Sequence, residues 1–507
     1  MALARAWAVA LLGVEGHVVE VEADLAQGLP GLSLVGLPDA SLNEARDRVR
    51  AAVHNSKLAW PTQRITVGLS PASLPKGGSS FDLAIAAAVL AAQGVVPADA
   101  VASCVLLGEL GLDGRVRATR GVLPAVLAAS RAGWERVIVP ASNAAEAALV
   151  AGVRVSGVAR LVDLVAVLRG ESDGEAEAQP ISDVEPPPEP DLGDVVGQDF
   201  GRLALEVAAA GGHNVFLHGP PGAGKTMLAA RLPGLLPALD DDEALEVSAV
   251  HSVAGLLAPG ASLLRRPPLR SPHHSATLPA IVGGGGRILR PGAASLAHLG
   301  VLFLDEAPEF RAGVIDALRQ PLESGWVDIA RASGTARFPA RFQLVLAANP
   351  CPQACVDERT CTCPSIARRR YLGRLSGALL DRVDLRVVVL PVRRVALLES
   401  AAAPESTAVV RERVGVARAA AAARLGELGL RRNADVPGPV LRRRFRLAPV
   451  TVAPLVGAVD RGLLSARGHD RVLRTAWTLA DLAGRTIPGP EEIRVALQLR
   501  AVAAEAA

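Results

Sequence analysis

The residues best suited to do chemistry lie in a glycine-rich stretch near the middle of the chain. In NVFLHGPPGAGKT, an apolar run leads into a loop that ends with Lys225 and Thr226. In this order of strand, loop and helix, backbone N–H groups turn towards phosphates, the lysine reaches the β- and γ-phosphates, and the hydroxyl binds Mg²⁺. The stretch predicts an ATP-binding loop that consists of Gly219, Pro220, Pro221, Gly222, Ala223, Gly224, Lys225 and Thr226.

Two later apolar runs end in polar residues of the kinds that hydrolysis requires. GVLFL is followed by Asp305 and Glu306, and we expect Asp305 to hold Mg²⁺ through water and Glu306 to polarise the attacking water. FQLVLAA is followed by Asn349, whose amide can orient the same water, although Asn-Pro is also a common turn. Together with the glycine-rich loop, these residues predict an ATP hydrolase that uses Mg²⁺.

Four of the five cysteines stand within thirteen residues directly behind Asn349. They are Cys351, Cys355, Cys361 and Cys363. Four thiolates can form a tetrahedral Zn²⁺ site, and in a reducing compartment such a cluster indicates a metal or catalysis before it indicates disulfides. A bound zinc would be structural and would brace the strand before Asn349 against the basic run 368–370. A reduced surface loop and a redox switch are the alternatives.

Composition excludes several classes of protein. The 507 residues are half hydrophobic and carry a net charge of +3, which indicates about three globular domains and, by itself, neither a nucleic-acid nor a membrane partner. No apolar run reaches the roughly 18 residues of a membrane helix, and the alternating EGHVVEVEA after the apolar start is unlike a signal-peptide cleavage site. We therefore expect a cytoplasmic protein without membrane contact.

A segment that cannot build a core divides the chain. Residues 171–190 contain seven acidic residues, five prolines and no basic residue, which predicts a disordered linker. Residues 1–170 alternate β-like and Ala/Leu-rich runs and predict an α/β domain. Residues 191–392 predict an α/β ATPase core that includes the cysteine loop 351–363. Residues 393–507 are rich in Ala, Arg and Leu and predict a helical region.

Longer segments resemble the magnesium-chelatase-like AAA+ proteins of the ComM/YifB group. The resemblance is carried by DVVGQDFGRLALEVAAAGGHNVFLHGPPGAGKTMLA, RSPHHSATLPAIVGGGG, RPGAASLAHLGVLFLDEAPEF, LRQPLESG and LSGALLDRVDL. It implies an AAA+ α/β core with a P-loop, a C-terminal helical lid, and a hexameric ring with ATP between subunits. It also implies that Val195, Gly197 and Gln198 line the adenine pocket.

The same resemblance implies roles for two arginines. Arg382 matches the residue that reaches the γ-phosphate of the neighbouring subunit, although an ion pair with Asp381 or Asp384 is the alternative. Arg467 matches a second residue that senses ATP from a lid helix facing the nucleotide. Arg471 and Arg474 follow on the same helical face, so the assignment to Arg467 is the looser of the two.

Two loops with arginines are expected to face the pore of the ring, and thus DNA, by the pattern of the family. One is the insert 282–292 with Arg287 and Arg290, and the other is the hairpin-like WVDIARASGTARF with Arg331 and Arg337 near its turn. Phosphate charge supplies most non-specific affinity for nucleic acid, and few aromatic residues are present for base stacking. Two ordinary surface hairpins are the alternative.

The resemblance therefore implies an ATP-driven DNA translocase that moves branched recombination intermediates, as in natural transformation. The surplus of 25 arginines over 13 acidic residues from Pro364 to the C-terminus also favours DNA. The alternative is a chelatase-like ATPase that remodels a protein partner.

The N-terminal region resembles the Lon-protease-type domain, which has a ribosomal-S5-like α/β fold. The likeness is carried by PKGGSSFDLAIAAAVLAAQ and LLGELGLDGRVRATRGVLP. Ser80 stands where that family has its nucleophile, but the Gly-Gly-Leu-Lys stretch that supplies the lysine is absent. Because a serine needs a base to become a nucleophile, we expect no protease activity and instead a scaffold or a second DNA-contact surface.

Overall fold

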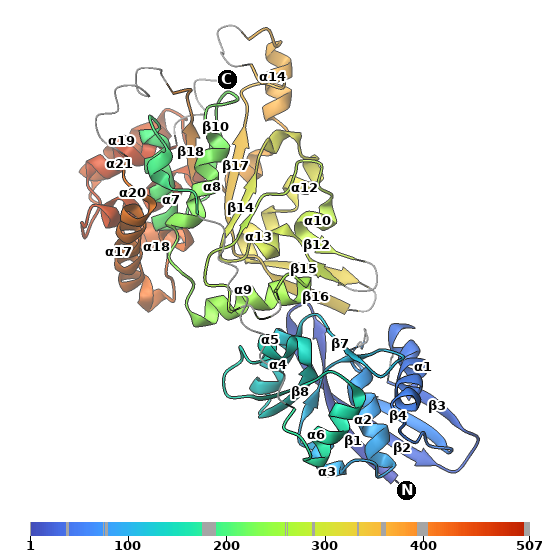
Figure 1. The fold of residues 1–507 in the computed structure, drawn as a ribbon. Helices are drawn as coiled ribbons and strands as arrows, with labels where there is room; N and C mark the ends of the chain where they lie inside the picture. Colours follow the sequence, from blue (N-terminus) through green and yellow to red (C-terminus); the bar gives the residue numbers. More distant parts are fainter. Residues whose placement is uncertain are drawn as a thin grey trace.

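The computed structural model describes most of the chain. The described residues are 2–36, 40–74, 76, 80–174, 189–258, 260, 262–285, 289–331, 334–355, 361–392 and 404–500. Most of the predicted linker 171–190 and Arg287 fall outside them. Figure 1 shows the N-terminal part at the bottom and the rest of the chain above it. Within the described part of the chain, no helix combines the length and the apolar character that crossing a membrane requires.

A seven-stranded mixed sheet forms the N-terminal part, in the order β3-β4-β2-β1-β5-β8-β9. Its strands are β1 (Ala2–Leu12), β2 (Glu15–Ala26), β3 (Gly31–Val35), β4 (Arg64–Ser70), β5 (Val105–Leu106), β8 (Arg136–Pro140) and β9 (Arg154–Val158). A short pair, β6 (Glu109–Leu110) and β7 (Val116–Arg117), lies outside this sheet. The helices are α1 (Ala40–Asn55), α2 (Asp82–Ala92), α3 (Ala98–Ala102), α4 (Val122–Arg131), α5 (Ala144–Ala147) and α6 (Leu161–Arg169). This mixed architecture confirms the α/β class expected from the sequence.

Helix α2 is the centre of the N-terminal part. All of its residues are buried, because a helix that is apolar on every side is stable only inside a protein. Its single charged residue, Asp82, receives two hydrogen bonds from Arg48 at 2.7 and 2.9 Å. A buried carboxylate needs such a partner, so this pair is a condition for burying the first turn of α2.

A five-stranded parallel sheet forms the core of the second part, in the order β11-β14-β17-β10-β18. Its strands are β10 (Val215–His218), β11 (Leu269–Arg270), β14 (Val301–Leu304), β17 (Gln343–Ala348) and β18 (Leu385–Val388). Strands β14 and β17 are entirely buried, as expected for a parallel sheet with helices on both faces. The register pairs His218 with Ala348 and Leu304 with Leu346. The three strands that precede the predicted chemical residues therefore end at one edge.

Helices and two small hairpins surround this sheet. The helices are α7 (Asp199–Gly211), α8 (Lys225–Leu235), α9 (Asp241–Ala254), α10 (Leu278–Val282), α11 (Ala293–Leu296), α12 (Ala312–Asp316), α13 (Arg319–Ser324), α14 (Ser365–Leu372) and α15 (Gly377–Leu380). The hairpins are β12 (Gly283–Gly284) with β13 (Arg290–Pro291), and β15 (Trp326–Arg331) with β16 (Gly334–Pro339). Helix α14 projects at the top of the molecule in Figure 1.

The C-terminal region is helical, as the sequence predicts. It contains α17 (Thr407–Leu425), α18 (Gly438–Arg443), α19 (Pro449–Asp460), α20 (Ala466–Leu482) and α21 (Pro490–Gln498). Val410 and Val414 of α17 share one hydrophobic core with Leu205 of α7 and Leu228 of α8. This region is called the lid below, and Figure 1 shows it at the left of the core.

The N-terminal part is packed against the core as well as joined to it by the linker. Leu11 and Val14, on either side of the β1–β2 turn, share a hydrophobic cluster with Val253 of α9 and Phe338 of β16. Between them, Gly13 pairs with Arg337 in an isolated β-bridge, and a Cβ atom at Gly13 would lie 2.3 Å from the Arg337 carbonyl oxygen. The acidic linker alone gave no sign of this contact.

The lid is held on the core by a buried carboxylate, Asp384, which is 2 % exposed. It accepts hydrogen bonds from Arg471 of α20 and from the Asn214 backbone, and His213 lies 3.7 Å away. Burial by itself would raise the pKa of Asp384, but Arg471 and His213 outweigh it and hold the pKa well below its usual range. A charge buried this deeply is stabilising only while its partners are present.

We expect Asp384→Asn to lower the free energy of unfolding by about 3–5 kcal/mol, because Arg471 would keep a buried charge without a counter-charge. A depressed carboxyl pKa contributes stability above the unfolded pKa, near about 3.9, and loses it as the pH falls through the folded pKa. The difference between the two proteins should therefore be full at neutral pH and shrink only in strong acid. Urea unfolding at several pH values measures it.

Asp460→Asn, on the exposed end of α19, is the matched control for the Asp384 substitution. It should change the free energy of unfolding by less than about 0.5 kcal/mol. Equal effects of the two substitutions would show that the Asp384 network does not hold the lid.

Candidate nucleotide-hydrolysis site

The glycine-rich loop 219–224 connects β10 to the first turn of α8. Gly222 and Gly224 have φ angles of +74° and +98°, which favour glycine because they lie in the left-handed region. A Cβ atom at Gly219 would lie 2.0 Å from the Val389 carbonyl oxygen. The loop therefore needs its glycines to reach the N-terminus of α8, where backbone N–H groups and the helix dipole favour a phosphate.

Lys225 is buried in this loop and is 7 % exposed. Its ammonium group donates to the carbonyl oxygens of Gly219 and Pro220 at 2.6 and 2.8 Å, and to Asn349 Oδ1 at 3.0 Å. Burial lowers the pKa of Lys225, and the nearby Asp305 and Glu306 carboxylates oppose that shift. The ammonium is thus held by oxygen atoms that phosphate oxygens can replace. The structure also brings Asn349 into direct contact with the loop.

Thr226 and Asp305 form the second contact across the site. The Thr226 hydroxyl donates to Asp305 Oδ2 at 2.7 Å, and Asp305 Oδ1 accepts from the Glu306 backbone at 2.9 Å. A hydroxyl and a carboxylate beside a triphosphate are the hard oxygen ligands that Mg²⁺ prefers. These two residues fit the predicted Mg²⁺ site.

Glu306 has a partner that the sequence did not predict. Its Oε2 atom lies 3.2 Å from His274 Nδ1, and both side chains are partly exposed. His274 follows β11, which neighbours β14 in the sheet, and its ring stacks on His273 at 4.1 Å between centroids. No spacing in the sequence relates His274 to Glu306, because only the order of strands makes them neighbours. In this arrangement one carboxylate oxygen of Glu306 is engaged.

The turn before α7 adjoins the loop, as predicted for the adenine pocket. Gln198 Nε2 donates to the Ala223 carbonyl oxygen at 2.9 Å and to that of Leu390 at 2.7 Å. Val195 is fully buried, and Gly197 has a φ angle of +70°. The residues of this turn lie beside the P-loop, and their role in binding adenine stays a prediction.

Arg382 and Arg467 lie at the opposite edge of the sheet from the P-loop. Arg382 comes just before β18, and its carbonyl oxygen accepts from Asn214, the residue before β10. Arg467 lies 3.7 Å from Asp381. Both arginines line one cavity of about 1020 Å³ between core and lid. Arg471 and Asp384 dock α20 at this edge, so Arg467 lies away from the P-loop of its own chain, and its role as a residue that senses ATP stays a prediction.

The ion pair of Arg382 is not the one that the sequence offered as an alternative. Its guanidinium donates to Glu323 of α13, and to the Ala378 carbonyl oxygen at 2.5 Å. The alternative partners Asp381 and Asp384 are not the ones it uses. The Arg382 side chain is mostly buried and Glu323 is largely exposed, so the partner of Arg382 stands at the surface, where another anion could replace it.

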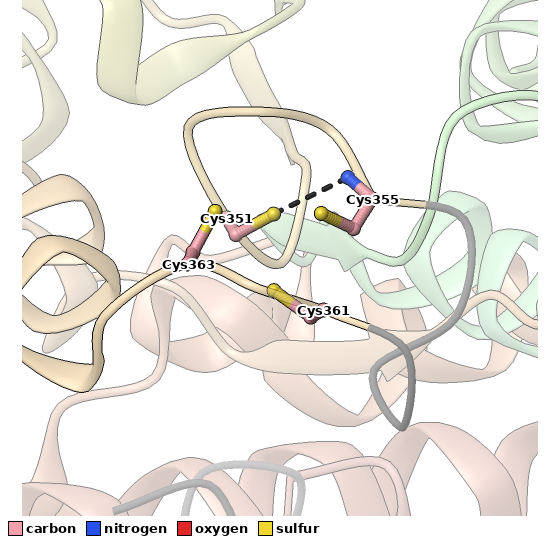
Figure 2. A group of neighbouring side chains, drawn as sticks. All are labelled: Cys351, Cys355, Cys361 and Cys363. Carbon is pink, nitrogen blue, oxygen red and sulfur yellow. Dashed lines mark hydrogen bonds between the residues drawn. The ribbon is translucent and has the colours of Figure 1, made fainter.

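The four cysteine sulfur atoms come together, as Figure 2 shows. All four lie within 4.8 Å of one another. Zn–S bonds of about 2.3 Å in a tetrahedron put sulfur atoms about 3.8 Å apart. Cys351 and Cys363 are buried, and the Cys355 backbone donates to Cys351 Sγ at 3.2 Å. The donor set and its compactness fit a structural zinc ion.

The arginines predicted to contact DNA are in different situations. Arg287 lies outside the described residues, and for Arg331 only the backbone, at the end of β15, is described. Arg290 is exposed in β13 and has no ion-pair partner among the described residues. Arg337 is not at the turn: it stands opposite Asp328, donates to it at 2.7 Å and lies over the Trp326 ring. Arg337 thus lies three residue pairs away from the turn, and its contact with DNA stays a prediction.

Ser80 and Lys76, four residues apart in the chain, are both among the described residues. The Ser80 side chain makes no hydrogen bond to another described residue, and Lys76 donates instead to the carbonyl oxygens of Pro71 and Gly36. Burial lowers the pKa of Lys76. Lys76 is thus held by carbonyl oxygens, and the lack of protease activity stays a prediction.

The parallel sheet, the P-loop at its carboxyl edge and the helical lid define a chelatase-like protein of the AAA+ class. Residues 191–397 match the family model of magnesium chelatase, subunit ChlI, and residues 404–500 match that of its C-terminal part. Residues 21–143 match the model described as subunit ChlI of Mg-chelatase. Membership of this class suggests ATP hydrolysis with Mg²⁺.

Known proteins match nearly the whole chain. It is 58% identical to an uncharacterised protein of Mycobacterium tuberculosis over 99% of both chains. It is 42% identical to competence protein ComM of Haemophilus influenzae, covering 96% of this chain and 94% of that one. It is 41% identical to the uncharacterised protein YifB of Escherichia coli, covering 97% and 96%. The chain therefore belongs to the ComM/YifB group of magnesium-chelatase-like AAA+ proteins. A shorter likeness, 29% identity over 137 residues, joins it to a Lon protease of Trichlorobacter lovleyi.

We expect His274→Ala to raise the basal rate of ATP hydrolysis, because it frees both Glu306 oxygens for water. A partly exposed pair is worth about 0.2–1 kcal/mol, so the increase should reach at most about fivefold. Steady-state phosphate release measures the rate, and His273→Ala is the control, because among the described residues the His273 ring packs against His274 and forms no ion pair with Glu306. A lower rate would mean that His274 orients Glu306 productively.

Proposed function

We propose that this protein is an ATP-driven ring motor that translocates on DNA and moves branched recombination intermediates. The observation that supports a ring-shaped ATPase is the separation of two groups of residues. Lys225 and Glu306 lie at one edge of the core sheet, and Arg382 and Arg467 lie at the other. A closed ring joins such edges between neighbouring copies. The likeness to a protein named competence protein ComM supports a role with DNA.

Different residues of the chain would have different roles in hydrolysis. Lys225 would exchange its carbonyl partners for the β- and γ-phosphate oxygens, while Thr226 and Asp305 hold the Mg²⁺ that offsets phosphate charge. Asn349, already in contact with Lys225, would orient the water beside the γ-phosphate. Glu306 would accept a proton from that water once its carboxylate no longer contacts His274.

The neighbouring subunit would complete the site with its arginines. Arg382 and Arg467 line the same cavity, so one subunit would present both to the triphosphate held by the next. An arginine supplied in this way is worth about 10³–10⁵ in turnover in related phosphoryl transfers. We propose a homo-hexamer on this basis.

Fewer arginines of the C-terminal third are available for DNA than their surplus over acidic residues suggests. Many arginines there are taken up by ion pairs: Arg374, Arg382, Arg411, Arg413, Arg424, Arg431, Arg432, Arg442, Arg444, Arg467, Arg471, Arg485 and Arg494. Such pairs leave less charge for phosphates. Support for DNA comes instead from the exposed Arg290 at the stem of the β12–β13 insert. Binding through the phosphate backbone would be independent of sequence.

We also propose that the cysteine cluster binds one Zn²⁺ ion. The support is the compact set of four sulfur atoms, two of them buried. Zinc held by four thiolates has no open position, so it would be structural and would take no part in the reaction.

We expect single-stranded DNA or a four-way junction to stimulate ATP turnover, and we expect the stimulation to fall as salt rises, because counterions compete for the phosphates. Phosphate release by the purified full-length protein measures it. Lys225→Ala is the blank and should abolish turnover. A wild-type rate that no DNA changes would contradict the DNA function and favour a chelatase-like remodeller of a protein partner.

We expect chains with Arg382→Ala and chains with Lys225→Ala to be inactive alone and to recover turnover when mixed. The mixture creates interfaces between an intact P-loop and an intact Arg382. Mixing Arg382→Ala with Arg467→Ala should give no recovery, since both arginines belong to the same edge and no interface is then complete. Recovery in that control, or none in the first mixture, would contradict shared sites.

A further inference from the structure

The cysteine cluster begins two residues after Asn349, and Asn349 is fixed from only one side by the sheet. The Ala348 carbonyl oxygen accepts from the Gly219 backbone at 3.2 Å, and the Asn349 side chain accepts from Lys225. Beyond Asn349 the chain leaves β17 and enters the cysteine loop. The conformation of that loop therefore bears directly on where the Asn349 amide points.

The loop is locally strained in a way that only a strong restraint would maintain. Ala354 has a φ angle of +50°, a left-handed conformation that costs a non-glycine residue about 1–2 kcal/mol. The turn it makes is closed by a hydrogen bond from its backbone to the Cys351 carbonyl oxygen at 3.0 Å. This turn aims the Cys355 N–H at Cys351 Sγ, the contact drawn in Figure 2. Backbone strain of this size persists where the surroundings over-determine it.

The far end of the loop returns to the catalytic residues through α14. Cys363 stands just before α14, and Tyr371 near the end of this helix is buried with its phenol group close to the Asn349 backbone. Arg374, two residues beyond α14, donates to the Pro308 carbonyl oxygen and to Glu309, both at 3.1 Å. These residues follow directly on Glu306. Both ends of the cysteine loop are thus connected to groups that act on the water.

We propose that the four-cysteine zinc site positions Asn349 for hydrolysis. The inference rests on the proposed ATP hydrolysis and the proposed zinc binding. It adds that the rate of ATP hydrolysis depends on bound zinc. Zinc would join residues 351–355 to residues 361–363 and so fix the distance between the end of β17 and the start of α14. Restraining a loop in this way removes conformational freedom that the chain would otherwise have.

The consequence follows from the geometry of water activation. An amide that orients a water must hold it at hydrogen-bond distance, and a misplacement of about 1 Å can cost about 10²-fold in rate. Binding of ATP depends on the P-loop, which the cysteine loop does not form. Loss of zinc should therefore lower kcat and leave nucleotide affinity nearly unchanged.

The metal is tested first. Full-length wild-type protein should contain about one zinc per chain, released by a thiol-modifying reagent and measured with a chromogenic chelator. Cys361→Ser, at a half-buried position, should contain almost none. Cys104→Ala is the matched control, because Cys104 is the one cysteine outside the cluster and is buried in the N-terminal part. Metal-free wild-type protein would overturn the inference.

A double-mutant cycle then tests whether the metal acts through Asn349. We expect Cys361→Ser and Asn349→Ala each to lower kcat by about tenfold or more, and the double variant to be no worse than Asn349→Ala. The dissociation constant of a fluorescent ATP analogue should change less than about twofold in all of them. Losses that multiply would show that zinc supports the fold alone and would overturn the positioning role.

Two measurements keep the outcomes apart. If Cys361→Ser does not fold, zinc is withdrawn instead from folded wild-type and Asn349→Ala protein by the thiol reagent, and kcat is compared before and after. Wild-type protein that hydrolyses no ATP under any condition refutes the proposed function. Zinc-loaded protein that hydrolyses ATP equally well without its zinc refutes only this inference.

Discussion

The structure depends on the hydrogen bonding of three parallel strands, β10, β14 and β17, in one register. Parallel strands that are paired along their length must end at the same edge, so whatever follows them is brought together. The P-loop, the Asp305–Glu306 pair and Asn349 follow these strands. The direct contacts of Lys225 with Asn349 and of Thr226 with Asp305 are consequences of that register.

The same sheet has a second edge, and the lid gives it a different chemistry. Asp384, just before β18, holds Arg471 of α20 by a buried ion pair. This docking places Arg467 beside Arg382, at the edge away from the P-loop. A single chain therefore carries the P-loop at one edge and Arg382 and Arg467 at the other, and the proposed ring of neighbouring copies rests on this separation.

The N-terminal part and the cysteine loop lie outside the sheet and contact the core. The N-terminal part packs on α9 and on the β15–β16 hairpin, where Gly13 allows the close approach to Arg337. At the carboxyl edge, α14 and the cysteine loop tie Asn349 to the segment behind Glu306. The N-terminal part and the cysteine loop thus bear on surfaces that the proposed mechanism uses, and neither supplies a reacting group of its own.

What the sequence by itself determined was local. The P-loop, Asp305, Glu306, Asn349 and the four cysteines could be predicted because each follows an apolar strand or stands in one short segment, so their neighbours are set by chain continuity. The α/β class and the helical C-terminal region could be predicted from hydrophobic patterns for the same reason.

Only the tertiary structure decided which distant residues meet. The pairing of His274 with Glu306 depends on strand order, and the position of Arg467 depends on how α20 docks on Asp384. The engagement of Arg337 depends on cross-strand pairing with Asp328 and on the packing of the N-terminal part. The first two contacts join segments that no sequence period relates, whereas Asp328 and Arg337 lie on one short hairpin whose register decides that they meet. Their geometry is set by the balance of burial and charge pairing over the whole fold.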